Sequence, residues 1–121
     1  SDLKNNYGNV KVHVDGQMMD SGNMFVGLFM GDHSKSGINT MFNTGTVVGI
    51  SSNVFGAGFP PKFIPSFSWG GPDKLIEYSA DKAVETAKIV MKRRKVEMTS
   101  KYEEQFKKLF AETAPERKGL K

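Results

Sequence analysis

The spacing of apolar residues in the last third of the chain predicts two helices. The first is expected after Ser79, with an apolar face formed by Ala83, Ala87, Val90 and Met91. It ends in the basic run at residues 92–95 (KRRK), and basic side chains in a last turn stabilise the negative end of the helix dipole. The run is therefore either a solvated helix end, which we favour, or a patch for phosphate or nucleic acid.

A second helix is expected to begin at Ser100, whose hydroxyl can cap the first turn while Glu103 reaches back to the Ser100 backbone. Pro115 follows the expected end of this helix, because proline cannot continue it. One face carries a stripe of residues at helical spacing: Tyr102, Phe106, Leu109, Phe110 and Thr113. We interpret this stripe as a packing surface rather than a ligand site.

The first half of the chain fits neither helical nor alternating periodicity, but it repeats every six residues. Seven of the eight positions in this register are apolar, the eight being Val12, Met18, Met24, Met30, Ser36, Phe42, Val48 and Val54. The residue four places further on is nearly always small, as at Gly16, Ser34 and Ser52. This pattern predicts a triangular coil with one short strand on each of three faces and about 18 residues per turn. The apolar residue of each repeat is expected to point inward.

Charge, glycine and proline divide the chain into two unlike halves. Residues 1–71 hold four Lys and four Asp, whereas residues 72–121 hold 13 Lys or Arg and nine Asp or Glu and carry the whole net charge of +4. Twelve of the 13 glycines lie in the first half, and four of the five prolines lie in residues 60–72. We therefore expect a β-coil at residues 9–59, a Pro/Phe-rich bridge at 60–72 and a helical tail at 73–121.

Composition excludes several classes of protein. The absence of cysteine excludes a disulfide scaffold, thiolate zinc sites and a cysteine nucleophile. Two histidines are too few for a three-histidine metal site, so no metal is expected. The chain has no run of 18 apolar residues and no signal-peptide pattern, which predicts a cytoplasmic protein without a membrane partner. Only Lys62 accompanies the aromatic residues of the bridge, so nucleic acid is not expected as a partner.

The hexapeptide repeats resemble a left-handed parallel β-helix, the domain shared by trimeric acyl-CoA-dependent acyltransferases. More narrowly, the chain is similar to the C-terminal domain of two-domain sugar-1-phosphate nucleotidylyltransferases with acetyltransferase activity, in their archaeal and Bacteroidetes-type members. The motifs that carry this resemblance lie at residues 11–16 (KVHVDG), 30–40 (MGDHSKSGINT), 43–49 (NTGTVVG) and 60–70 (PPKFIPSFSWG). The glycine-rich nucleotide loop of such enzymes is missing, so their nucleotidyltransferase domain is expected to be absent from this chain.

The resemblance implies a mainly β fold with an α-helical tail, and acetyl transfer from acetyl-CoA to a sugar phosphate such as a hexosamine 1-phosphate. Acyl transfer needs a base for the incoming amine or hydroxyl, and His33 is the neutral-pH base that the coil offers. The histidine of the matching archaeal motif also falls at His33. In bacterial bifunctional relatives the histidine lies at the position of Ile38 in this chain. This difference argues against their substrate geometry here but leaves the archaeal-type assignment of His33 in place. Asp32 is not assigned as a partner, because the side chains of adjacent residues usually diverge.

The remaining expectations concern binding. The sugar phosphate needs cations, for which Lys35 and Lys62 are candidates, although both lysines can serve solubility alone. Its hydroxyls are expected near Asn39 and Asn43, which equally suit the corners of a coil. The pantetheine arm of acetyl-CoA is expected along strand amides at Thr40, Gly45 and Gly49.

Three function classes remain open. The first is the acetyltransferase, and the second is a non-catalytic domain that trimerises a sugar-1-phosphate nucleotidyltransferase. In both, the partner is a second and third copy of the chain, because so few repeats bury little surface alone. The third is a zinc enzyme of the carbonic-anhydrase type, which needs more histidines than His13 and His33.

Overall fold

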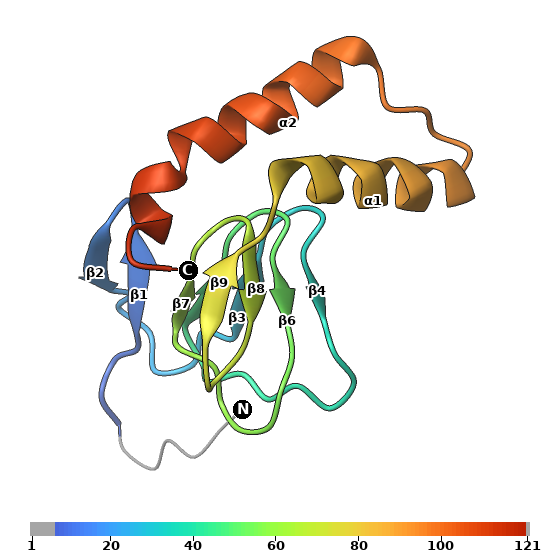
Figure 1. Cartoon of the computed structure of the whole chain (residues 1–121). Coiled ribbons are helices and arrows are strands. Elements are labelled where there is room, and N and C mark those ends of the chain that lie inside the picture. Colours follow the sequence, from blue (N-terminus) through green and yellow to red (C-terminus); the bar gives the residue numbers. More distant parts are fainter. Residues whose placement is uncertain (1–6, 121) are drawn as a thin grey trace.

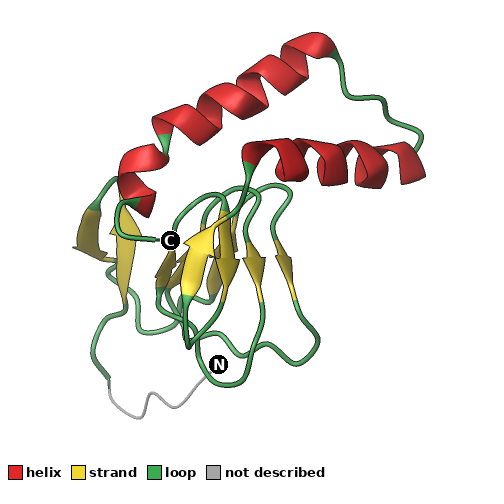
Figure 2. Ribbon diagram, viewed as in Figure 1, coloured by secondary structure: helices red, strands yellow, loops and turns green. Residues whose placement is uncertain are grey.

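The computed structural model describes residues 7–120, in which nine short strands precede two helices (Figure 1). The strands are β1 (Lys11–Val14), β2 (Gln17–Asp20), β3 (Leu28–Met30), β4 (Lys35–Ser36), β5 (Thr46–Val48), β6 (Asn53–Val54), β7 (Phe63–Ile64), β8 (Ser68–Gly70) and β9 (Leu75–Glu77). The helices are α1 (Ala80–Arg93) and α2 (Ser100–Glu112), followed by a short 3-10 helix, η1 (Ala114–Arg117). Both long helices lie across one end of the strands (Figure 2).

The strands form three separate sheets. β1 and β2 make an antiparallel pair, β3-β5-β7 make a parallel sheet, and β4-β6-β8-β9 make a mixed sheet whose last pair is antiparallel. In the first parallel pairs each residue meets the one 18 positions further on, as Met30 meets Val48. In the next pairs the offset is 16, as Val48 meets Ile64. The six-residue register therefore continues only from β3 and β4 to β5 and β6.

The predicted left-handed parallel β-helix is wrong for this chain. The strands are two to four residues long, and their sheets neither curl nor close into a coil. The first two repeats instead form a hairpin, in which Asp15 and Gly16 have φ of +48° and +80°. Positive φ at both central residues is typical of the two-residue turn that Asp-Gly favours between antiparallel strands. Asp-Gly is itself a hairpin signal, and the six-residue repeat does not take it into account.

The inward positions expected from the six-residue register are also only partly buried. Val12, Val48 and Val54 are buried, but Met18 and Met30 are 54% and 40% exposed. Met18 lies on the outer hairpin strand, and Met30 lies on β3, at the edge of its sheet. An apolar side chain is removed from water only where other elements cover it, and these two strands have cover on one side at most.

The described residues contain two hydrophobic clusters. One lies among the strands and joins Val48, Val54 and Ile64, with Phe42 and Leu75 packed against it. The other joins the helices to the strand layer and contains Phe67, Tyr78, Ala83, Val84, Ala87 and Phe106. The Pro/Phe-rich bridge supplies a member to each cluster, so it holds the helices against the strands.

The two helices occur where the sequence predicted them, with one correction at the start of α2. Thr99, not Ser100, is the N-cap, and its hydroxyl accepts a hydrogen bond from the Tyr102 N–H at 3.1 Å. Glu103 forms ion pairs with Lys88 of α1 and Lys107 instead of reaching back to the cap. Its hydrogen bonds with these two lysines lower the pKa of the Glu103 carboxyl. The capping motif is therefore replaced by a link between the helices.

Arg117 fastens the end of the chain to the strands, and its side chain is only 1% exposed. The guanidinium donates to Glu77 Oε2 at 3.0 Å, the Ser66 carbonyl at 3.1 Å, Thr113 Oγ1 at 2.7 Å and the Phe110 carbonyl at 2.6 Å. It also lies 4.2 Å from the centre of the Phe110 ring. Five donors and a planar shape let one arginine satisfy all of these acceptors.

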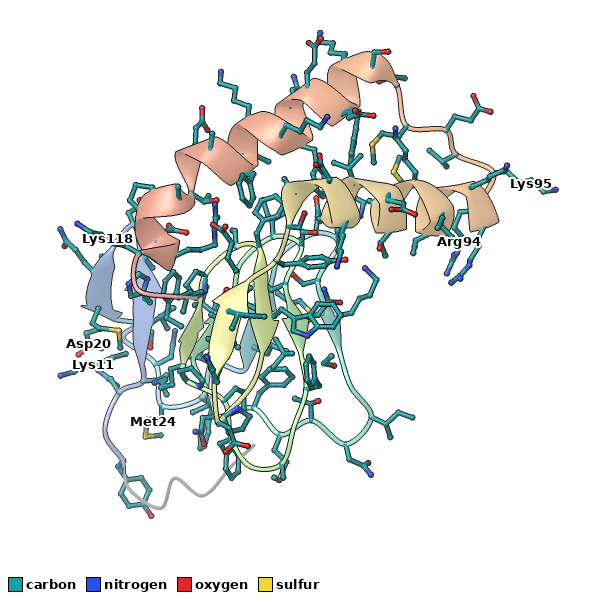
Figure 3. All side chains as sticks on the ribbon, in the orientation of Figure 1. Lys11, Asp20, Met24, Arg94, Lys95 and Lys118 are labelled. Carbon is teal, nitrogen blue, oxygen red and sulfur yellow. The ribbon has the colours of Figure 1, made fainter. Side chains whose placement is uncertain are left out.

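The basic run at residues 92–95 lies at the far end of α1 from the strands. Arg94 and Lys95 extend outward there (Figure 3), and all four side chains are exposed. Arg94 ends the helix, with its N–H bonded to the Met91 carbonyl at 3.0 Å. This arrangement agrees with a solvated helix end.

Candidate functional site

His33 lies in the turn between β3 and β4, where helix α2 covers it. Its φ is +61°, a left-handed conformation that histidine adopts more readily than most residues. The Ser51 N–H donates to the carbonyl of Asp32 at 2.9 Å and ties this turn to the next stretch of chain. The imidazole Nε2 lies 2.7 Å from the hydroxyl oxygen of Tyr102, and the Phe106 ring meets the imidazole edge to face at 5.3 Å between centroids.

A cleft of about 140 Å³ opens beside the His33 ring. It is lined by Asp32, His33, Ile50, Tyr102, Gln105, Phe106 and Leu109. Asp32 and His33 of the turn therefore line one side of the cleft, and α2 lines the other with both polar and apolar side chains. The His33 ring makes two aromatic contacts across this cleft, with Tyr102 and Phe106.

The electrostatics of the cleft favour a neutral imidazole. Burial is the main cause that lowers the pKa of His33, and the charge of Lys35 lowers it further, while the charge of Asp32 acts in the opposite direction. Burial also lowers the pKa of the Lys35 ammonium. A histidine whose pKa lies below its ordinary value is unprotonated at neutral pH, the state that a general base requires.

Of the predicted substrate-binding residues, the structure places Lys35 next to His33. The Lys35 ammonium donates to the His33 carbonyl at 3.1 Å. Lys62 instead donates to the Lys11 carbonyl of the hairpin at 3.0 Å. Asn39 is an exposed corner with φ of +61°, and the backbone carbonyl of Asn43 accepts a hydrogen bond from the Thr46 hydroxyl at 2.6 Å. All four residues, Lys35 included, lie outside the lining of the His33 cleft, and the contact of Lys35 is with the His33 backbone.

The predicted acetyl-CoA positions are occupied by bonds within the chain. The Thr40 hydroxyl donates to the Gly37 carbonyl at 2.8 Å. The Gly45 and Gly49 N–H groups donate to the carbonyls of Gly27 and Ile64 at 2.7 and 2.8 Å. A side chain at Gly49 would overlap the backbone of Ser66, so this glycine allows two segments to approach closely. An acyl donor would therefore find both glycine amides already bonded.

Sequence reasoning missed the α2 side of the cleft. Tyr102 and Phe106 were assigned to packing because they lie four residues apart on an apolar stripe, as buried residues usually do. Gln105, the polar residue beside them, gave no signal at all. A tyrosine on such a stripe was the one clue, because its hydroxyl needs a polar partner.

Residues 7–120 were also searched for metal-binding groups and for membrane-spanning helices. No group of three or more His, Cys, Asp or Glu side chains there can hold a metal ion. No helix in that range has both the length and the apolar character needed to span a membrane.

Comparison of the chain with protein-family models, with curated proteins and with solved structures found no match in any of the three. The resemblance to sugar-1-phosphate nucleotidylyltransferases with acetyltransferase activity thus stays a prediction.

Proposed function

We propose that this chain is an acyltransferase that uses His33 as general base, with acetyl-CoA as donor and a sugar phosphate such as a hexosamine 1-phosphate as acceptor. The observation that carries the proposal is the cleft beside His33, where the ring is held by Tyr102 and burial lowers the pKa of the imidazole. The residues at 30–40 that resemble the acetyltransferase motif are the ones that form this turn.

The proposal gives each ring nitrogen of His33 a role. With the Tyr102 oxygen as acceptor, the ring proton stays on Nε2 and the Nδ1 lone pair is the base. In the proposed reaction, Nδ1 takes the proton of the acceptor amine or hydroxyl as that atom attacks the thioester carbonyl. The carbon–sulfur bond then breaks, and the imidazolium returns the proton to the departing thiolate.

Lys35 is the cation nearest the proposed base. Its bond to the His33 carbonyl keeps the ammonium beside the turn, where it can face the phosphate of the acceptor or the developing oxyanion. The proposal assigns no such role to Lys62, which is bonded to the hairpin. In this scheme His33 acts from the turn and Lys35 from the start of β4, and Tyr102 acts as a positioning residue from α2.

Release of the CoA thiol tests the proposal directly. The chain is incubated with acetyl-CoA and either glucosamine 1-phosphate or galactosamine 1-phosphate, and thiol is measured with and without the sugar. We expect sugar-dependent thiol release and an acetylated product of matching mass. Thiol release that does not depend on any hexosamine phosphate would contradict the assignment of the acceptor, and no release would contradict the activity.

A second candidate is a non-catalytic domain that assembles the protein as a homotrimer, and the exposed apolar surface of the strands favours it. Met18, Met19, Phe29 and Met30 are each 40% or more exposed. The chain presents 8129 Å² to solvent, against about 6,500 Å² for a compact chain of this mass.

Analytical ultracentrifugation decides between the candidates when it is combined with the thiol assay. A particle of three times the chain mass without activity supports assembly alone, whereas a particle with activity supports both roles. A monomer at micromolar concentration contradicts the assembly role. The proposed use of acetyl-CoA also places the chain in the cytoplasm, where this donor is present.

A further inference from the structure

A cleft of about 600 Å³ lies between the β8–β9 pair and helix α1. This volume falls within the range of small-molecule sites, roughly 300–1,000 Å³. The cleft shares no lining residue with the cleft beside His33. It is therefore a second hollow with its own chemistry, and the proposed acyl transfer does not use it.

The strand wall of this cleft is aromatic and apolar. Trp69 and Ile76 stand directly opposite each other on β8 and β9, so their side chains share one face of the sheet. The Tyr78 ring lies behind Trp69, with 5.1 Å between ring centroids, and the Phe55 ring meets the indole edge to face at 5.5 Å. Trp69 is nevertheless 40% exposed, so these contacts fix the ring while one part of it stays open to solvent.

The helix wall carries one charge of each sign. Lys82, Glu85 and Ile89 are three and four residues apart, which places them on one face of α1 beside the cleft. Glu77 also lines the cleft, but its carboxylate is already paired with the Arg117 guanidinium at 3.0 Å. The charges left for a ligand are therefore one ammonium and one carboxylate.

This combination favours a ligand that both donates and accepts hydrogen bonds. An anion would face the Glu85 carboxylate, a cation would face the Lys82 ammonium, and a purely apolar molecule would desolvate both charges without replacing their hydrogen bonds. Hydroxyl groups both donate and accept, so a polyhydroxylated molecule satisfies both charges at once. A sugar ring adds a face of C–H groups that can stack on the electron-rich face of an indole.

We propose that this cleft is a carbohydrate-binding site, in which an uncharged sugar ring stacks on Trp69 and its hydroxyls bond to Lys82 and Glu85. The site is separate from the sugar phosphate that the cleft beside His33 is proposed to take. Its binding and the acyl transfer can therefore succeed or fail independently.

The fluorescence of Trp69 tests this site, because it is the only tryptophan in the chain. The chain is titrated with glucose, galactose, N-acetylglucosamine and the β-1,4-linked dimer of N-acetylglucosamine, and with choline as a cationic probe. We expect a saturable change in emission with at least one sugar. No saturable change with any sugar, or tighter binding of choline than of every sugar, would overturn the proposal.

Charge-removing variants locate the site. Glu85→Gln and Lys82→Met are each expected to weaken sugar binding at least fivefold, and both positions are exposed, so the fold is expected to persist. Glu104→Gln, an exposed carboxylate on α2, is the matched control and is expected to bind as the unaltered chain does. Equal weakening by Glu104→Gln, or unchanged binding by both cleft variants, would place the sugar elsewhere and contradict the proposal.

Discussion

The strands of the first 70 residues differ sharply in how much of their apolar surface other elements cover. On β5, β6 and β7, Val48, Val54 and Ile64 are at most 2% exposed. On β2 and β3, Met18 and Phe29 are 54% and 52% exposed. β5 and β6 have a neighbouring strand on each side, and Ile64 of the edge strand β7 packs in one cluster with Val48 and Val54. β2 and β3 are also edge strands, but none of their residues belongs to either hydrophobic cluster of the described residues. Residues with the same apolar character therefore form a core in one region and a surface in the other, according to their neighbours.

The comparison is sharpest at one pair of residues, Met30 and Val48, which face each other in the register of β3 and β5. Val48→Asp is expected to lower the free energy of unfolding by about 4 kcal/mol or more, because the carboxylate is buried without a partner. Met30→Asp is expected to cost less than about 1 kcal/mol, because the new charge reaches water. Urea denaturation of both variants measures the difference. Equal losses would mean that β3 is as covered as β5 and would break the comparison.

Removal of the Arg117 guanidinium is expected to have the next largest effect. Arg117→Ala leaves the Ser66 and Phe110 carbonyls without their shared donor, at a cost of about 3 kcal/mol in the free energy of unfolding, while the half-exposed Glu77 carboxylate can be solvated by water. Lys118→Ala, at the exposed neighbouring position, is expected to change it by less than about 0.5 kcal/mol. Thermal or urea unfolding gives both values. A loss no larger than that of Lys118→Ala would show that η1 does not fasten the helices to the covered strands.

His33 gives a smaller effect that depends on pH. Because burial lowers its pKa in the folded chain, the unfolded chain binds the proton more readily. Its contribution is thus present above the unfolded pKa of about 6.5 and is lost as pH falls through that value toward the folded pKa. We expect the melting temperature of the unaltered chain to fall more steeply than that of His33→Gln between pH 8 and pH 5. Parallel curves would contradict the lowered pKa.

The smallest expected effect concerns the Tyr102 hydroxyl. Tyr102→Phe removes one hydrogen bond to the half-exposed His33 and keeps the ring, so the free energy of unfolding is expected to fall by no more than about 1 kcal/mol. If the hydroxyl positions the imidazole, the same variant reduces acyl transfer about tenfold, a size typical of an orienting hydrogen bond. Unchanged kcat together with unchanged stability would contradict a positioning role for Tyr102.

The sequence predicted the helices well and the strand region poorly, for a physical reason. The apolar positions of α1 and α2 are spaced by the helix itself, so local pattern and structure agree. The six-residue pattern specifies which residues are apolar but not which strands stack above them. It could not tell the parallel pair of Met30 and Val48 from the antiparallel hairpin around Asp15 and Gly16.

The candidate site was likewise predicted only in part. His33 and Lys35 lie two residues apart, in the turn and at the start of β4, and were found from a single motif. Tyr102 is 69 residues away from His33, and only the packing of α2 on the strand layer brings the two together. No local pattern contains that contact.

The most direct test of the account is a pH–rate profile of acetyl transfer for the unaltered chain, His33→Gln and His13→Gln. His13 is a suitable control, because its ring stacks on Phe63 at 3.7 Å and lies outside the His33 cleft. We predict that His33→Gln loses about 10²–10⁴ in rate and that His13→Gln keeps the rate. The rate of the unaltered chain should begin to fall only when the pH is below about 6.5, the ordinary histidine pKa, because burial lowers the pKa of His33. Equal rates for the two variants, or a folded and inactive unaltered chain, would contradict His33 as the base.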